Sequence, residues 1–166
     1  MDLLDLIRKQ INALPSQSAD LSSSKPLVDR VTAALQSFPK YYAEHHSSVK
    51  IESEAQLMGA LSGFLSSVLS GVQTTTGRIF RTSKPHYVDI VISSANQTII
   101  VELKRGNYVS LVERGVVQLS TYLNAANAKY GILFLYSDMF TEYDVTAWSG
   151  DQAGTEIYIV RPAVKP

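Results

Sequence analysis

Asp89 and Glu102 have the spacing of two carboxylates that face each other across a pair of strands. Both lie in YVDIVISSANQTIIVELKRG, residues 87–106, which has two strand-like runs joined by the turn-forming residues SANQ. If SANQ forms the turn, Ser93 lies opposite Thr98, and counting back along both strands sets Asp89 opposite Glu102. The Cβ atoms of such a pair are about 5 Å apart. The spacing therefore predicts that the two carboxylates lie close together.

Two carboxylates at this distance repel each other unless they share a proton or bind a cation. The chain has no cysteine, which excludes thiolate ligands and leaves oxygen and imidazole ligands. Mg²⁺, or Mn²⁺ in its place, suits one or two carboxylates with waters and phosphate oxygens, and the carbonyl of Leu103 could add a ligand. Lys104 shares a strand face with Glu102 and could stabilise an attacking hydroxide or the charge on a phosphate. The pattern predicts metal-dependent phosphate chemistry.

The helix predicted over residues 51–70 contributes a third acidic candidate. Glu54 falls on the stripe formed by the apolar residues at three-to-four spacing between Met58 and Val68. A carboxylate on a buried stripe costs free energy unless it is paired or bound to a metal. We therefore expect Glu54 to point inward and to bind a second ion or an ordered water; Glu52 would take its place if the helix were rotated.

The helix predicted after the strands adds two polar candidates. It opens with Ser110 and Glu113 in the spacing of a capping box. Gln118 and Tyr122 lie four residues apart in the same helix and so share one of its faces. We expect that face to lie beside the two carboxylates.

The remaining elements complete a mixed α/β (α+β) fold. Three strand-like runs should form an antiparallel meander; they cover residues 77–82, 87–93 and 98–104. The apolar run YGILFLY, residues 130–136, predicts an interior parallel strand reached by a helical crossover. A last strand, EIYIV, is expected to cover an edge. The predicted order is thus α-β-β-β-α-β, a mixed sheet flanked by helices.

Asp89, Glu102 and Lys104, with twelve residues and then one residue between them, resemble the signature of the PD-(D/E)xK nucleases, which have the restriction-endonuclease-like fold. The order of elements over residues 50–136 is similar to the core of that fold. Members often carry an acidic residue on the first core helix, where Glu54 lies. Val88 stands where the motif has its proline.

Gln118 and Tyr122 resemble the QxxxY motif of RecB-type and lambda-exonuclease-type nucleases, in which this helix packs beside the active site. The resemblance implies that Gln118 positions a substrate phosphate or the lysine, and that Tyr122 supports the site.

The resemblance implies a nuclease that uses Mg²⁺ or Mn²⁺ to hydrolyse phosphodiester bonds, preferably in DNA, and that leaves a 5′-phosphate. Two alternatives stay open: a metal-dependent ribonuclease or toxin, and a nucleic-acid-binding or structural module that has the fold without the activity. Five basic residues flank the predicted site and could contact phosphates; they are Arg78, Arg81, Lys84, Arg105 and Arg114. His86 could act as a base, although we expect an ordinary turn residue, and His45 and His46 read as solvated loop residues.

Composition sets the wider limits. The 166 residues are 45% hydrophobic, with 15 basic and 15 acidic side chains. This suits a globular chain whose zero net charge gives no general attraction to nucleic acid or to an anionic membrane, so binding must be local or helped by a partner. No apolar run reaches the roughly 20 residues that span a bilayer, and the start of the chain is acidic, which favours a cytoplasmic location without membrane contact.

Two segments are expected. Residues 1–45 read as an N-terminal helical appendage with a serine-rich connector, and residues 46–166 as the nuclease-like domain. The appendage begins with an amphipathic helix whose apolar stripe includes Ile7 and Ile11. Three surfaces could cover this stripe: the rest of this chain, a second copy in a homodimer, or another protein. A second helix should begin at Pro26 and end at Pro39.

Overall fold

The computed structural model describes residues 2–14, 25–46, 48–148 and 154–164. Helices and strands follow one another as α1 (Leu3–Asn12), α2 (Lys25–His45), α3 (Glu54–Val68), β1 (Gln73–Arg81), β2 (Pro85–Ser94), β3 (Gln97–Arg105), α4 (Val109–Ala126), β4 (Tyr130–Tyr136), β5 (Tyr143–Ala147) and β6 (Glu156–Pro162). The run from α3 to β4 has the expected α-β-β-β-α-β order. The mixed α/β class with an N-terminal helical part is confirmed.

The strands form one six-stranded mixed sheet in the order β1-β2-β3-β4-β6-β5. The first three strands are an antiparallel meander, and β4 lies parallel to β3, as expected for a strand reached through α4. The prediction for EIYIV was wrong: this strand, β6, lies between β4 and the short strand β5, which is the edge. The sequence YDVTA of β5 is too short and too polar to stand out as a strand.

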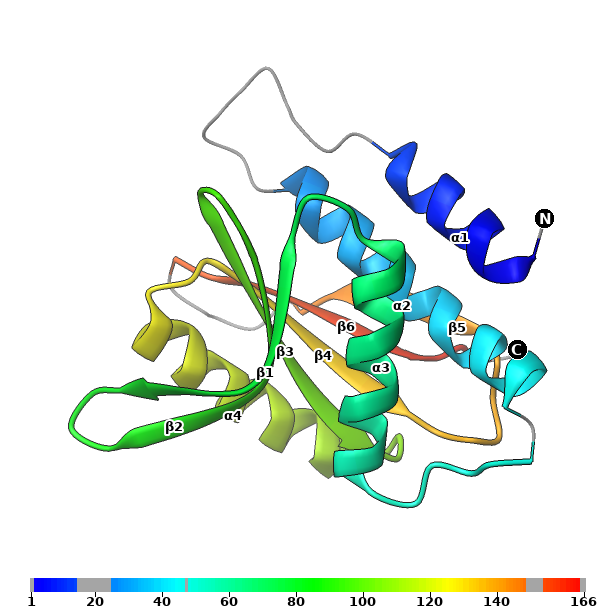
Figure 1. Cartoon of the computed structure of the whole chain (residues 1–166). Helices are drawn as coiled ribbons and strands as arrows, with labels where there is room; N and C mark the ends of the chain where they lie inside the picture. The colour runs from blue at the N-terminus through cyan, green and yellow to red at the C-terminus, as the bar shows by residue number, and fades with distance from the viewer. Residues whose placement is uncertain (1, 15–24, 47, 149–153, 165–166) are drawn as a thin grey trace.

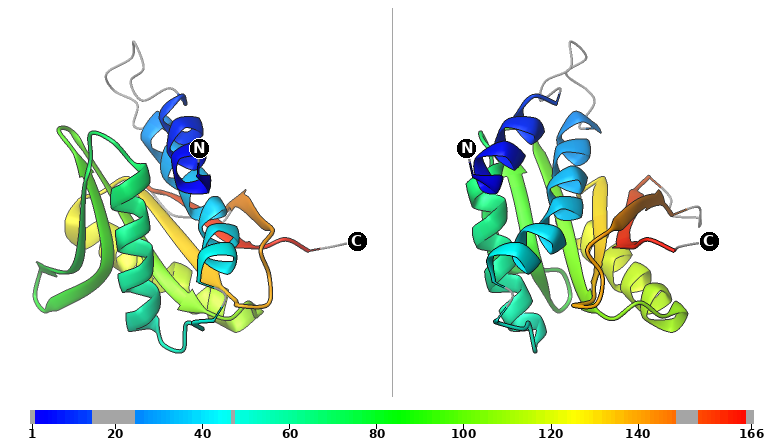
Figure 2. Two further views of the ribbon diagram at one scale, coloured as in Figure 1. Left: turned by 45° about the vertical axis from the view of Figure 1, so that its right-hand side comes forward. Right: turned by 90° about the vertical axis from the view of Figure 1, so that its right-hand side faces the viewer.

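Helices cover both faces of the sheet (Figures 1 and 2). α1, α2 and α3 lie on one face, where alternate residues of β3 such as Val101 and Leu103 join their core. α4 lies on the other face with Ile100 and Leu133. The predicted alternation along β3 is therefore confirmed, and it places the side of the strand that bears Glu102 toward α4.

α4 lies unusually close to the sheet because a glycine faces β4. A Cβ atom built on Gly115 would be 2.7 Å from Cδ1 of Leu133, closer than real contacts allow. The predicted capping box of α4 was wrong, since the helix begins at Val109 after Tyr108, whose side chain makes no capping bond. Ser110 is already inside the helix. The close packing holds the following turns of α4 against the sheet.

α3 begins with a pair of capping hydrogen bonds, similar to a capping box, that the sequence analysis missed. The side chain of Ser53 accepts a hydrogen bond from the main-chain N–H of Gln56, and the Gln56 side chain accepts one from the N–H of Glu52. These bonds start the helix at Glu54, three residues later than expected.

The N-terminal helices are built into the main core. Ile7 and Ile11 of α1 are buried in the same cluster as residues of α2, α3 and the sheet. The guanidinium of the buried Arg30 in α2 donates to Asn12 Oδ1 (2.8 Å) and to the carbonyl of Ser70 (3.1 Å), tying α1 and the end of α3 together. The described part of residues 1–45 is thus a layer of the domain and does not hang free as an appendage. The stripe of α1 has its partner within this chain.

α2 continues through Pro39 to His45, so the prediction that it ends at Pro39 was wrong. Proline removes one helical hydrogen bond, but the last turns are held by aromatic packing. Tyr41 lies 5.0 Å from Phe64 of α3, and Tyr42 lies 5.6 Å from Phe38, measured between ring centroids. His45 is accordingly the end of a helix and not a loop residue.

Among the described residues, no helix combines the length and the apolar character that crossing a lipid bilayer requires.

Replacing Phe38 by alanine should destabilise the domain by about 3–5 kcal/mol, the usual cost of deleting a buried aromatic ring. Phe38 is fully buried and contacts Phe64, Phe134 and Tyr136, so it joins α2 to α3 and to β4. Thermal unfolding followed by circular dichroism should show one transition at a lower Tm. Val49→Ala, at a position that is 58% exposed, is the control and should change little. An unchanged Tm for Phe38→Ala would contradict the shared core.

Candidate active site

The site forms where β2 and β3 separate. Their pairing includes Ser93 opposite Thr98, as expected, and ends at Ile90 opposite Val101. The loop is shorter than predicted, because Ser94 also pairs with Gln97. The same register carried one position further sets Asp89 opposite Glu102, so the prediction of the register is confirmed.

Asp89 takes the place of a main-chain acceptor at this point. Its Oδ2 accepts a hydrogen bond of 2.9 Å from the main-chain N–H of Leu103. Beyond it the β1–β2 hairpin turns away from β3 (Figure 1). β1 follows the bend at Gly77, which has a φ of 62° and lies between the pairs Thr76–Ile90 and Arg78–Val88. A positive φ is a conformation that glycine adopts at little cost.

Glu102 is buried beside Asp89 with one ammonium group. Its side chain is 4% exposed, and its Oε1 lies 3.3 Å from Nζ of Lys104. Its Oε2 is buried and receives no hydrogen bond from the described residues. Burial first, and then the negative charge of Asp89, raise the pKa of Glu102 to about 8, while Lys104 opposes the rise. The pKa of Asp89 is also raised by burial, against the bond from Leu103 and the charge of Lys104.

α4 holds the lysine in place through two hydrogen bonds. Nζ of Lys104 donates to Oε1 of Gln118 (2.9 Å), and Nε2 of Gln118 donates to the hydroxyl of Tyr122 (2.6 Å). Burial raises the pKa of Tyr122, and the nearby carboxylates Glu102 and Asp89 add to the rise. Gln118 and Tyr122 therefore share the expected face and reach the carboxylate pair through Lys104.

His86 belongs to this group, contrary to the expectation of an ordinary turn residue. It is the second residue of β2 and is buried, and its ring lies edge-on to the ring of Tyr122, with 6.1 Å between centroids. Its Nε2 is 3.0 Å from Oγ1 of Thr82. The signal that could have identified it is its place in the strand, with Val88 two positions on and facing the same core.

The prediction that Glu54 points inward was wrong. The buried side of α3 is formed by Leu57, Leu61 and their neighbours, while Glu54, the first helical residue, is exposed. α3 also covers the opposite face of the sheet from α4. Glu52 is exposed as well, and the described residues contain no group of three or more His, Asp or Glu side chains arranged to hold a metal ion. The predicted three-acid cluster is reduced to the pair formed by Asp89 and Glu102.

The start of α3 nevertheless lies beside the end of β3. The guanidinium of Arg105 donates to the carbonyls of Glu52 (2.6 Å) and Ile51 (3.3 Å). The backbone just before Glu54 therefore lies beside the end of β3, although the side chain of Glu54 faces solvent. The Arg105 guanidinium thus bonds the main chain before α3, whereas we expected it to be available for a phosphate contact.

The other basic candidates divide into two groups. Arg114 on α4 bonds the carbonyl of Ser110 and the hydroxyl of Tyr108. Arg78, Arg81 and Lys84 are exposed on the β1–β2 hairpin.

His45 and His46 stack on tyrosine rings at the end of α2. The ring of His45 lies 4.6 Å from Tyr41, and that of His46 lies 5.0 Å from Tyr42, between centroids. Both residues are exposed, and His46 lies outside the helix, so the expectation of solvated residues is confirmed for both and that of a loop residue for His46.

A hollow of about 530 Å³ lies away from the carboxyl pair, between α1, α2 and the segment that leads into β5. Its lining includes Leu3, Tyr41 and Glu142, on the face of the sheet opposite α4. The hollow and the carboxyl pair thus lie at different places on the protein. The carboxyl pair carries more weight, because Glu142 is the one acidic side chain among the described residues that line the hollow.

A comparison with protein-family models gave no match, and a comparison with curated protein sequences gave no match either.

The metal-free protein should lose stability as the pH rises from about 5 to 8. The pKa of Glu102 is 4.5 in an unfolded chain and about 8 when folded, so in this window the unfolded chain has lost a proton that the folded protein still holds. The free energy of unfolding should fall by up to about 1.4 kcal/mol per pH unit and level off above pH 8. Urea unfolding in EDTA across this range measures it.

Glu102→Gln removes the titrating group and should flatten this dependence, leaving the variant more stable than the wild type at pH 8. Glu113→Gln, at an exposed position of α4, is the matched control and should keep the wild-type slope. Equal slopes for the wild type and Glu102→Gln would show that Glu102 does not titrate as the geometry requires.

Proposed function

We propose that the protein is a divalent-metal-dependent nuclease that hydrolyses phosphodiester bonds, with DNA as its preferred substrate, in the cytoplasm. The observation that carries the proposal is the pair formed by the buried Glu102 and the half-buried Asp89 where β2 and β3 separate, with Lys104 bonded to both Glu102 and Gln118. The resemblance of these residues to the PD-(D/E)xK and QxxxY signatures points to the same reaction.

A hard divalent cation suits the residues present. Oε2 of Glu102 is a buried acceptor without a donor among the described residues, and the negative charge of Asp89 lies close enough to raise the pKa of Glu102. The carbonyl of Leu103 leaves the same edge of β3 as its N–H, which already bonds Asp89. Two carboxylates and a carbonyl match Mg²⁺ or Mn²⁺, which also takes waters and phosphate oxygens. When bound, the cation would neutralise phosphate charge and lower the pKa of the attacking water.

The protein groups divide the remaining work. Asp89 is fixed by the N–H of Leu103, so its second oxygen keeps one direction. Lys104 supplies positive charge where the attacking hydroxide and the pentavalent phosphate carry negative charge. Gln118 accepts one bond from the ammonium group and donates to Tyr122, which fixes the direction of Lys104 without touching the phosphate.

A purely structural role explains this arrangement less well. One buried acid paired with one lysine would be balanced, whereas the second acid adds repulsion and raises the pKa of Glu102 further. Such a cost in stability is typical of sites kept for binding or catalysis. Glu54, exposed near the end of β3, could serve the substrate side of the site but is not needed for the pair.

Lys104→Ala should lower the rate of DNA cleavage by about 10²- to 10³-fold, the usual loss when one group that stabilises transition-state charge is removed. The assay measures the conversion of supercoiled and linear plasmid and of labelled single strands, in Mg²⁺ and in Mn²⁺. Lys129→Ala is the matched control, because Lys129 is an exposed lysine just before β4, at the opposite end of the sheet.

A wild-type protein that cuts none of these substrates would overturn the proposal and favour a binding module. RNA and DNA of one sequence, tested side by side, separate a deoxyribonuclease from a ribonuclease.

Gln118→Ala should slow cleavage by about 10- to 100-fold, as expected for a group that orients another site residue. Its effect should appear in kcat, with the affinity for Mn²⁺ little changed, since Gln118 contacts Lys104 and not the carboxyl pair. Thr121→Ala, on the exposed side of the same helix, is the control. A loss of metal affinity equal to the loss of rate would assign Gln118 a different role.

A further inference from the structure

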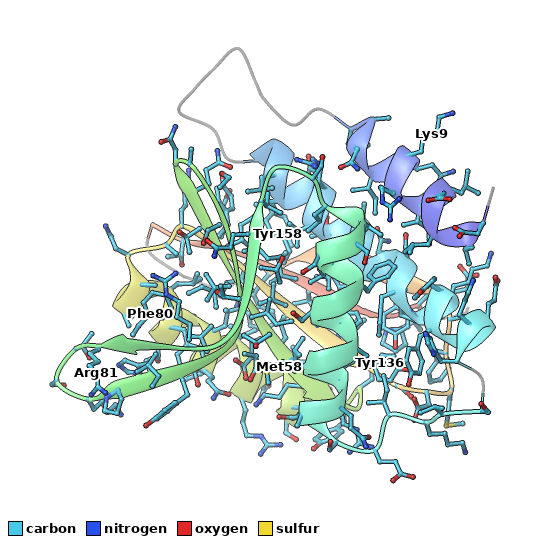
Figure 3. The ribbon with its side chains drawn as sticks, viewed as in Figure 1. Lys9, Met58, Phe80, Arg81, Tyr136 and Tyr158 are labelled. Atoms are coloured by element: carbon cyan, nitrogen blue, oxygen red, sulfur yellow. The ribbon has the colours of Figure 1, made fainter. Side chains whose placement is uncertain are left out.

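The β1–β2 hairpin projects beyond the sheet at the site itself. From Arg78 to Tyr87 its two strands pair only with each other, because the pairing of β2 with β3 has ended at Ile90. Figure 1 shows this part leaving the sheet, and Figure 3 labels Arg81 near its free end. We call residues 78–87 the arm.

The arm is basic in a chain whose net charge is zero. It carries Arg78, Arg81 and Lys84, all exposed, and the sequence from Gln73 to Val88 contains no acidic residue. None of the three cations takes part in an ion pair with the residues that the structure describes. The arm therefore presents local positive charge of the kind that attracts a phosphate backbone.

The two faces of the arm differ in a way that points to bases as well as phosphates. On one face the partly buried Phe80 packs against the core beneath α4, the guanidinium of Arg78 lies over its ring, and His86 is buried. On the other, Tyr87 is 62% exposed and lies directly opposite Ile79, which is 42% exposed. Arg81 shares this face with Ile79, two residues away along β1. An exposed aromatic ring with an apolar neighbour and a guanidinium group nearby is a surface on which an unpaired base can stack.

We propose that the arm binds a single DNA strand, with a base stacked on Tyr87 and phosphates held by Arg81 and Lys84. A duplex keeps its base faces covered within the stack, so the Tyr87 surface favours an unpaired strand or end. The inference rests on the proposed function, since Tyr87 precedes Asp89 by two residues and is about 7 Å from it along β2. A strand held on the arm would pass directly to the carboxyl pair.

The root of the arm is connected to the catalytic lysine by contacts already described. His86 lies against Tyr122, and Tyr122 reaches Lys104 through Gln118. The position of the arm is thus fixed relative to the site, as a binding element that orients its substrate must be.

Fluorescence anisotropy of the full chain in EDTA tests the arm without cleavage. A short labelled single strand should bind more tightly than the duplex of the same sequence. Tyr87→Ala should weaken single-strand binding by about tenfold, within the range for loss of one stacked base, and leave its salt dependence unchanged. Tyr87→Phe, which keeps the ring, should bind like the wild type.

Arg81→Ala should act differently from Tyr87→Ala. It should reduce the slope of log affinity against log salt by about 0.7, the value for one phosphate contact to a single strand. Phe140→Ala and Lys129→Ala are matched controls, because they remove an exposed aromatic ring and an exposed cation outside the arm. Both should bind like the wild type.

Three results would overturn the inference: tighter binding of the duplex, no single-strand binding by the wild type, or arm variants that bind like the controls. Its failure is distinguishable from failure of the proposed function. Cleavage that depends on Lys104, together with normal binding by the arm variants, would refute the role of the arm and support the proposed nuclease activity. Binding that depends on Tyr87, without any cleavage, would support the role of the arm and refute the proposed nuclease activity.

Discussion

The structure depends on one buried and one half-buried carboxyl group that lie beside a single ammonium group at the place where β2 and β3 separate. Asp89 bonds the N–H of Leu103 in place of a strand partner, and Glu102 lies almost wholly out of solvent with its pKa raised to about 8. Without a cation the protein resolves the repulsion by keeping a proton. A divalent cation would replace that proton, so the same feature that destabilises the metal-free protein at alkaline pH prepares it for metal.

The separation of β2 from β3 after the pair Ile90–Val101 affects the structure toward the hairpin and toward α4. Beyond Asp89 the hairpin is released from β3 and becomes an arm, bent at Gly77 and rooted by His86 against α4. On the other side, the close approach of α4 at Gly115 brings Gln118 within 2.9 Å of Lys104. The separation of the two strands thus leaves Asp89 free to bond Leu103 and releases the arm that we propose as the substrate-binding element.

The sequence predicted what depends on short repeats along the chain. Alternation in β3 and the turn before it were enough to place Asp89 opposite Glu102, and helical spacing was enough to put Gln118 and Tyr122 on one face. The wrong predictions concern the residues at which helices begin, or contacts between segments that are far apart in the sequence. Glu54 was placed inward because helical phase alone does not say that it is the first residue after the Ser53 cap. The bonds of Arg105 to residues 51 and 52, and the burial of α1 against α3, join segments that are far apart in sequence.

The most direct test of the account is the number of protons released when Mg²⁺ or Mn²⁺ binds at pH 7. Titration calorimetry in two buffers of different ionisation enthalpy measures it. The account predicts binding with release of close to one proton per site, because Glu102 is still largely protonated at this pH, and no such release from Glu102→Gln. Absence of binding, or binding with the same proton count in both proteins, would contradict the claim that a cation takes the place of the proton between Asp89 and Glu102.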